Sequence, residues 1–435
     1  MKTSLYIELV EKWFSTIKGK IDLKINGKKE AGEYLHEHVL TTEYTHDLKW
    51  DSASVSDVVV AADVVALDSP LPLKKRGSLA RASGSIVKTG MKKSLNESEI
   101  TNLNILGRLG KWVQMIAKLF EDTPKCALGI KERVEMMFLE AISTGFTIVG
   151  GIIGDTETED NTGTAVRVNF GFLDKNKYKA TIKWGELGYT PISDIERAVA
   201  GAESTIAVIW LSKIAYSLLR NSDESKRLYA NFKSIPIQTN SILPTPNKSQ
   251  FNEAFEEEYG ITFKVIDREI ITEKDGKRTK IKPFSVDTLV LLTQDTDLGR
   301  VVYGELAEET NPVAGVVYEK IGDYILISKY AKNDPLREFT SSQALVLPVI
   351  DGVSEIYLLQ TQEAAAPSSQ KAAAPTPNSD EVTIGESNFP KADVIAALNA
   401  IGVPTTGNTG VPKVTEKVVA LTEEQLAELL EILNS

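Results

Sequence analysis

The spacing of apolar residues predicts helices between residues 94 and 145. Apolar side chains recur every three or four positions from 103 to 120, and again from 124 to 144. The second stretch is the best candidate for a long helix, and we expect it to end at Gly145, because glycine readily adopts the left-handed conformation that closes helices. Ser94 and Glu97 have the spacing of a capping box and predict the start of the first helix.

Strand patterns replace helical patterns after residue 145. Runs rich in β-branched and aromatic residues predict strands at 146–154, 164–172, 177–184, 287–295, 301–307, 324–331, 343–350 and 355–362. Between them we expect a helix at 192–202, a buried strand at 204–210 and one or two helices at 211–232. Asp275 and Gly276 separate two alternating runs within 261–284, which predicts a hairpin. The alternation indicates a sheet packed against helices.

A compositional boundary follows the last of these strands. Residues 361–381 are rich in Ala, Pro, Ser and Gln and lack apolar periodicity, which is typical of an extended linker. Beyond it, 391–402 and 421–433 have the pattern of two short helices, with Thr422 and Gln425 at capping-box spacing. We therefore expect a small helical module at the C-terminal side of the linker.

Composition fits a folded, non-membrane protein. The 435 residues exceed what one compact core usually holds, and the chain is 42% hydrophobic and 25% charged. A single Cys126 cannot form an intrachain disulfide, which suits a reducing compartment. The first residues lack the apolar core of a signal peptide, and the most apolar stretch, 146–154, is too short to span a bilayer. We expect no membrane role.

A basic strip, Leu71–Asn96, stands out because the chain as a whole carries a net charge of -11. The strip holds no acid, and its cations are Lys74, Lys75, Arg76, Arg81, Lys88, Lys92 and Lys93. It also lacks the aromatic residues on which single-stranded nucleic acids stack. Its many Gly and Ser residues indicate a long flexible loop. Either nucleic acid or another protein surface, such as a copy of the same acidic chain, would satisfy its charge.

No catalytic machinery is visible. His36, His38 and His46 lie close in sequence, and the first two would share a face on a strand and offer two metal ligands, but a solvated arm explains them as well. No histidine follows residue 46 to act as a base, and Cys126 sits among the apolar residues of a helix. The glycine-rich 150–155 lacks the other residues of a phosphate-binding loop. We expect no catalytic residue, no metal and no cofactor.

The segment 329–350, KYAKNDPLREFTSSQALVLPVI, resembles the closing segment of the phage lambda-type major capsid protein, a member of the major capsid protein E family with the Hong Kong 97-type shell fold. The most specific part of this segment is a short motif at positions 334–339, which is followed by an apolar strand. The motif residues are Asp334, Pro335, Arg337, Glu338 and Phe339. Other segments, including the basic loop and the long helix, follow in the family's order, so the resemblance covers roughly residues 51–362.

The resemblance implies an α+β fold with a defined order of parts. These are an N-terminal arm at 1–50, an extended loop region at 51–96, a peripheral domain at 97–180, an apical domain at 181–318 and closing peripheral strands at 319–362. The linker, 363–381, and the C-terminal helical module, 382–435, extend beyond the family's pattern.

The resemblance also implies a structural role. The chain would assemble with itself into hexamers and pentamers of the icosahedral head of a tailed phage, in the cytoplasm of a bacterial host. Portal, scaffold and decoration proteins would be further partners, and the packaged double-stranded DNA would be contacted non-specifically. The seven cations of the basic strip would be intersubunit contacts. The alternatives are an encapsulin-like compartment shell, a nucleic-acid-binding protein that uses the cations at 74–93, and a metal-dependent enzyme at the three histidines.

Overall fold

The computed structural model describes residues 4–26, 34–55, 79–149, 166–235, 243–274, 276–363, 381–384 and 387–405, with positions 414, 417, 418, 421, 425, 429 and 432. The chain divides into two compact units, Met1–Ala364 and Ala365–Ser435. The predicted bend at 150–155, most of the linker, Asp275 and Thr422 lie outside the described residues.

A six-stranded main sheet forms one side of the first unit. Its order is β1-β13-β16-β15-β14, and β4 also pairs with β16. The strands are β1 (Leu40–Tyr44), β4 (Lys88–Leu95), β13 (Gly299–Gly304), β14 (Val317–Ile321), β15 (Ile325–Asn333) and β16 (Leu336–Ile350). The β1–β13 pair is parallel and the other pairs are antiparallel. Strand β16 therefore joins segments that are more than 200 residues apart in the sequence.

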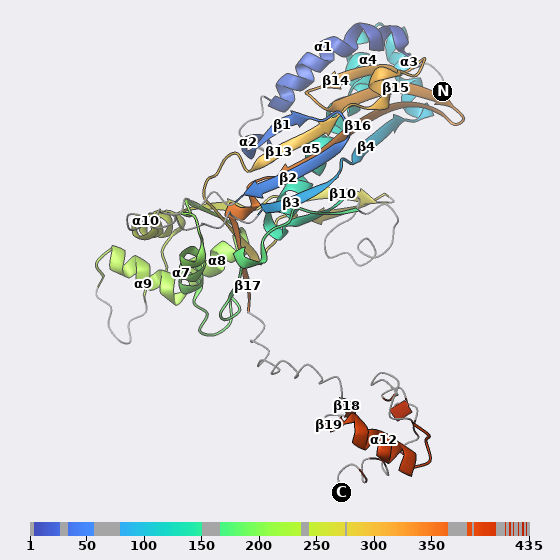
Figure 1. Ribbon diagram of the computed structural model, residues 1–435. Helices are drawn as coiled ribbons and strands as arrows, with labels where there is room; N and C mark the ends of the chain where they lie inside the picture. The colour runs from blue at the N-terminus through green and yellow to red at the C-terminus, as the bar shows by residue number, and fades with distance from the viewer. Residues whose placement is uncertain are drawn as a thin grey trace, which may run out of the picture. The chain divides into compact units, whose positions relative to one another are not determined.

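The long helix α5 (Asp122–Thr144) packs along this sheet (Figure 1). It ends at Gly145, whose φ of 85° is left-handed, as the sequence predicts. On the predicted apolar side Val134, Met137 and Phe138 are fully buried and Leu128 is half-buried, and Met136 and Leu139 on other sides are buried as well. A helix buried on most sides needs packing partners on more than one face.

A second sheet supplies another of these partners. Its order is β7-β17-β12-β8-β9, and its strands are β7 (Lys177–Ala180), β8 (Val208–Ser212), β9 (Thr262–Ile266), β12 (Thr288–Leu292) and β17 (Ile356–Glu363). Successive strand residues point to opposite faces. Trp210 accordingly joins the core that contains α5, whereas Ile209 and Leu211 join a separate core. That core also contains residues of α7 (Pro191–Gly201), α8 (Lys213–Asn221) and α10 (Lys248–Tyr259).

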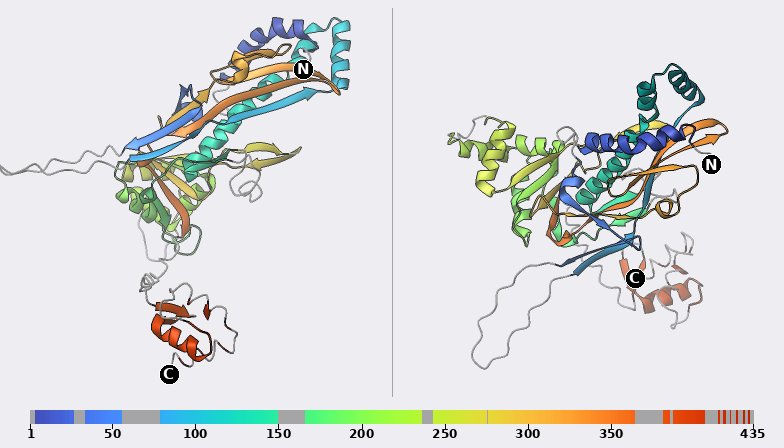
Figure 2. Two further views of the ribbon diagram at one scale, coloured as in Figure 1. Left: turned by 45° about the vertical axis from the view of Figure 1, so that its right-hand side comes forward. Right: turned by 90° about the horizontal axis from the view of Figure 1, so that it is seen from above.

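Several shorter elements complete the first unit. Helix α1 (Ile7–Asn26) packs on β14 and α5, and α3 (Glu97–Arg108) and α4 (Trp112–Leu119) precede α5. Helix α9 (Asp223–Phe232) follows α8, and the short helices are α2 (His36–Val39) and α11 (Ala307–Thr310). Three two-stranded ribbons are β2 (Lys49–Val55) with β3 (Leu79–Ser85), β5 (Phe146–Val149) with β6 (Val166–Asn169), and β10 (Ile270–Lys274) with β11 (Lys277–Ile281). Figure 2 shows the β10–β11 ribbon projecting from the body.

The second unit contains the ribbon of β18 (Glu381–Ile384) and β19 (Ser387–Pro390) and the helix α12 (Lys391–Ala400). Gly402, with a φ of 83°, follows the helix as expected. Val394 and Leu398 pack with Val414 and Leu429 in a small core. The module is therefore not purely helical. The sequence patterns did not predict the β18–β19 ribbon.

Several local predictions are confirmed. The helix over 192–202 forms, and two helices that meet next to Asn221 form within 211–232, although residues 211 and 212 still belong to β8. Strands β10 and β11 pair around the Asp275–Gly276 position, where Gly276 has a φ of 76°. Each of these signals depends on residues close in sequence.

Three local predictions are wrong. The capping box is formed by Asn96 and Glu99 rather than Ser94 and Glu97, because Ser94 still pairs with Phe339 in the main sheet. The run 261–284 contains two strands before its turn, and the first, β9, belongs to the second sheet. The basic strip is not loop throughout, since residues 79–85 and 88–95 are strands.

Sheet membership also crosses the expected domain boundaries. Strands β7 and β17, placed in the peripheral ranges 97–180 and 319–362, pair in the second sheet, whereas β13, placed in the apical range 181–318, pairs in the main sheet. The expected arm at 1–50 is not detached: Val10 and Phe14 are buried, and β1 lies inside the main sheet. Long-range pairing, which local patterns do not encode, decides these placements.

Phe138→Ala tests the packing of α5. Phe138 is fully buried, and the centroid of its ring lies 6.4 Å from the ring centroid of Trp210. The cavity should cost about 3–5 kcal/mol of unfolding free energy, measured as a lower urea midpoint of the unassembled subunit. Lys125→Ala, on the exposed side of the same helix, is the control and should change stability by about 0.5 kcal/mol or less. Equal midpoints for the two variants would contradict this packing.

Candidate assembly surfaces

The family motif forms the turn between β15 and β16. Asp334 and Pro335 are its two turn residues, because Asn333 pairs with Leu336 across the ribbon. The peptide bond before Pro335 is cis. Arg337 is exposed and Glu338 is buried, as alternation along a strand requires. Phe339 stacks on Tyr330 with ring centroids 5.2 Å apart.

Glu338 fastens the N-terminal segment to the main sheet. It is only 1% exposed, and its carboxylate accepts hydrogen bonds from the Ser4 hydroxyl at 2.5 Å and the Leu5 backbone N–H at 3.1 Å. Hydrogen bonds to a charged group contribute more than neutral ones, about 1.5–3 kcal/mol. The motif therefore holds the start of α1 in place.

Lys329 lies beneath the same motif and is completely buried. Its Nζ donates to the Leu119 carbonyl and to the Thr340 hydroxyl, both at 2.8 Å. The Leu119 carbonyl and the Thr340 hydroxyl are therefore two acceptors, as many as a deprotonated lysine amine has N–H bonds to donate. Burial lowers the pKa of Lys329 from 10.5 to about 8, although the charge of Glu338 opposes the shift.

A second buried carboxylate anchors the segment around α2. Glu135 of α5 accepts the backbone N–H groups of Leu35 and His36, and His36 Nδ1 lies 2.6 Å from it. These contacts keep the pKa of Glu135 below its usual value even though burial acts in the opposite direction. Two buried carboxylates thus hold two parts of the N-terminal region on the body.

The seven cations of the basic strip are separated by the fold. Lys74, Lys75 and Arg76 lie outside the described residues, as does the side chain of Arg81 on β3. The other three lie on β4 in the main sheet: Lys88 is 4.0 Å from Glu308, Lys92 lies 5.8 Å from the Phe339 ring centre, and Lys93 is 3.6 Å from Asp122. These three contact their own chain and remain partly or fully exposed.

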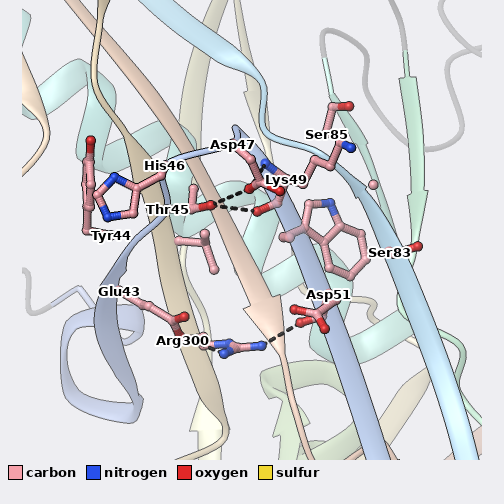
Figure 3. A pocket seen from close by; sticks show the side chains of 13 residues that line it. Glu43, Tyr44, Thr45, His46, Asp47, Lys49, Asp51, Ser83, Ser85 and Arg300 are labelled. Atoms are coloured by element: carbon pink, nitrogen blue, oxygen red, sulfur yellow. Dashed lines mark hydrogen bonds and ion pairs between the residues drawn. The ribbon is translucent and has the colours of Figure 1, made fainter.

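An open groove of about 810 Å³ lies between the main sheet and the base of the β2–β3 ribbon. We call it the hairpin groove; it is lined by residues 43–47, 49–51, 83–85, 300 and 302. Figure 3 shows Glu43 and Asp51 on opposite sides of Arg300, and Asp47 close to Thr45 and Lys49. The turn that carries Asp47 is fixed because this carboxylate accepts the Thr45 hydroxyl at 2.9 Å and the Lys49 N–H at 3.2 Å.

Arg300 connects the two walls of the hairpin groove. Its guanidinium pairs with Glu43 of β1 at 2.6 Å and with Asp351 at 3.2 Å, and it donates to the Asp51 carbonyl of β2 at 2.5 Å. Burial, with the nearby charges of Glu43 and Asp51, raises the pKa of Asp351. Carboxylates thus outnumber the cations around this site.

Trp50 leaves an unused donor at the groove. The side chain is 3% exposed and packs on Phe170, yet its indole N–H has no hydrogen-bond partner among the described residues. A Cβ on Gly84 would lie 2.9 Å from that nitrogen, so glycine is required there. An unsatisfied buried donor costs about 1–3 kcal/mol.

The three histidines do not form one site. His36 faces Glu135, while the ring of His46 packs edge-on against Tyr44 at 4.7 Å. Among the described residues no group of three or more His, Cys, Asp or Glu side chains is placed to hold a metal ion.

Cys126 is buried, which raises the pKa of its thiol to about 11. No described helix is long and apolar enough to cross a membrane.

Sequence reasoning missed the residues that organise these surfaces. Arg300 and Trp50 carried no local signal, because their partners lie more than 30 residues away in the sequence. Glu135 was recognisable only as a charge inside an apolar pattern, and Glu338 was recognised as a motif residue but not as an anchor for the N-terminal segment. Such an interruption of a buried face is the one signal that could have indicated their anchoring roles.

Glu338→Ala should loosen the N-terminal segment. Ser4 and Leu5 lose their shared acceptor, so amide hydrogen exchange in α1 should accelerate roughly tenfold or more, the change that about 1.4 kcal/mol produces. Arg337→Ala, one residue earlier and exposed, should leave exchange unchanged. If α1 exchanges at the wild-type rate in both variants, Glu338 does not hold this segment.

Lys329→Met should change how stability depends on pH. Between pH 8 and 10.5 the unfolded chain holds the lysine proton and the folded chain has released it, so wild-type stability rises with pH. The variant lacks this contribution. Over this pH range the free energy of unfolding of the wild type should therefore rise by up to about 1.4 kcal/mol per pH unit relative to that of the variant. Urea unfolding at several pH values measures the difference; a constant difference would contradict the lowered pKa.

Comparison with known proteins identifies the family. The family model for phage major capsid protein E matches residues 22–357. Among solved structures, one assigned as a prophage capsid protein of Escherichia coli CFT073 is 15% identical, with 79% of this chain and 98% of that chain covered and a TM-score of 0.48. No curated protein sequence matches the chain.

Two further structures are similar at lower scores. A phage-related protein from Bordetella bronchiseptica RB50 is 9% identical over 79% of this chain and 96% of that chain, with a TM-score of 0.43. The encapsulin of Synechococcus elongatus PCC 7942 is 10% identical over 74% and 85%, with a TM-score of 0.36. The assignment rests on the family model, which spans nearly all of the first unit. The chain, whose fold is of the α+β class, belongs to the phage major capsid protein E family and is a capsid protein.

Proposed function

We propose that this chain is the major head protein of a tailed phage, which assembles in the cytoplasm of a bacterial host into hexamers and pentamers of an icosahedral shell around double-stranded DNA. The observation that carries the proposal is the family match over residues 22–357. The role is structural rather than enzymatic. Portal, scaffold and decoration proteins are its further partners, and DNA is contacted non-specifically.

The mechanism is assembly through repeated contacts between subunits. The segment between β2 and β3, residues 56–78, carries Lys74, Lys75 and Arg76 across an adjacent subunit and pairs them with acidic surface. Arg81, Lys88, Lys92 and Lys93 are the remaining candidate contacts, and the last three keep exposed surface for that purpose. One exposed ion pair contributes only about 0.2–1 kcal/mol, so stability of the shell depends on repetition.

Electron microscopy tests the proposal directly. The purified chain should form capsomers or closed shells. Particles from the producing cell should contain nuclease-protected double-stranded DNA and one vertex with a portal. An encapsulin-like compartment, the second candidate, would yield closed shells that hold protein cargo and no genome. A chain that stays monomeric under all assembly conditions would refute both.

Reversing the charge of the loop should prevent assembly. The variant K74E/K75E/R76E should remain folded, with an unchanged circular dichroism spectrum, but should form no shells in sedimentation and microscopy. The variant K74R/K75R/R76K keeps the charge and serves as the control that assembles. Normal shells from the charge-reversed variant would show that these cations are not intersubunit contacts.

A further inference from the structure

We infer that a pocket beside α2 binds an alkylammonium group, the chemistry that free polyamines and lysine side chains share. The pocket has a volume of about 170 Å³ and lies where α2, β1 and β13 meet the turn between β14 and β15. We call it the α2 pocket; it is lined by residues 36, 37, 40, 42, 131, 301 and 321–325. The inference does not depend on the proposed assembly, because every residue that carries it belongs to one subunit.

A buried histidine gives the α2 pocket an unused hydrogen-bond acceptor. His36 is 1% exposed, and its Nδ1 lies 2.6 Å from Glu135. The contacts of Glu135 hold its pKa low, so this carboxylate is ionised and can only accept hydrogen bonds. The neutral imidazole therefore carries its proton on Nδ1 and keeps a lone pair on Nε2. This Nε2 is buried and has no partner among the described residues, so it calls for an occupant that donates.

Carboxylates outnumber cations around the α2 pocket. Glu37 and Asp323 are exposed residues of its lining, and Glu135 contacts His36. The only cation among the described lining residues is Lys131, which already pairs with Glu37 at 2.6 Å. Asp323 forms no ion pair with any other described residue. The surplus of negative charge favours a cationic occupant and disfavours an anion.

Tyr324 shows that two of these charges act on the same part of the pocket. Its side chain lines the pocket and is almost completely buried. Burial raises the pKa of Tyr324, and the charges of Glu37 and Asp323 raise it further. A cation bound near this phenol is therefore attracted by both carboxylates at once.

The remaining walls suit a hydrocarbon stem. The apolar lining residues are all buried: Leu40, Val301, Ile321 and Ile325. A methylene chain that displaces water from these side chains is favoured because apolar surface becomes buried. The volume is about ten times what one water molecule needs, so the pocket has room for an organic group. An apolar stem that ends in a charged hydrogen-bond donor is the structure of an alkylammonium ion.

Ligand titration tests this chemistry on the unassembled, full-length subunit. The probe n-butylammonium should shift the NMR resonances of the His36 ring and bind at least about tenfold tighter than n-butanol, which has the same stem but no charge. The anion n-butyrate should not bind, because the carboxylates repel it. Equal binding of n-butylammonium and n-butanol, or tighter binding of n-butyrate, would overturn the inference.

Two variants locate the binding site. Asp323→Asn removes one charge from the pocket and should weaken n-butylammonium binding up to about fivefold, the effect of one exposed ion pair. Asp287→Asn removes the same charge from an exposed position outside the pocket and should bind like the wild type. Circular dichroism checks that both variants fold. If Asp323→Asn binds n-butylammonium as tightly as Asp287→Asn does, the amine site is not the α2 pocket.

Assembled shells distinguish the two sources of the amine. If a lysine side chain of a neighbouring chain fills the pocket, shells should no longer bind n-butylammonium, and Asp323→Asn should raise the concentration needed for assembly. If the ligand is a free polyamine, shells and subunits should bind n-butylammonium equally well, and the variant should assemble normally. Both results support the inference. A subunit that does not bind n-butylammonium refutes it and leaves the proposed function intact, because that function is scored by shell formation alone.

Discussion

The packing of α5 against β16 is the constraint on which the rest of the structure depends. Strand β16 pairs with β13, β15 and β4, and α5 packs against β16, β15 and β4 while it also contacts β12 of the second sheet. One helix and one strand thus hold segments from residue 88 to residue 350 in a single core. Burial of large apolar side chains such as Met137 and Phe138 provides the driving force.

This core also determines where the polar exceptions occur. Glu135 of α5 and Glu338 of β16 are buried charges, and each is satisfied by backbone or side-chain donors from the N-terminal region. Burying a charge is costly unless it is fully hydrogen-bonded. The N-terminal region is therefore held by interactions that fail together with the core. At the base of the β2–β3 ribbon, by contrast, the buried indole N–H of Trp50 has no hydrogen-bond partner among the described residues.

Local sequence signals predicted the elements well, and long-range pairing accounts for most of the errors. As expected, Gly145 ends α5 and Gly276 lies in the turn between β10 and β11. Both signals are local because each position requires a positive φ. The capping box was misplaced because pairing of Ser94 with a strand almost 250 residues away extended β4. The family motif was recognised from sequence, but the anchoring role of Glu338 required knowledge of what lies above it. Only some of the predicted contact cations lie among the described residues, so their common role stays a proposal.

Because α5 and β16 bury their apolar side chains within one subunit, we expect this core to be complete before assembly, with assembly changing only the surface. Hydrogen–deuterium exchange on unassembled subunits and on shells tests this most directly. We predict that the amides of α5 and β16 are equally protected from exchange in both states. Fast exchange throughout α5 in the unassembled subunit, with protection appearing only in the shell, would contradict it.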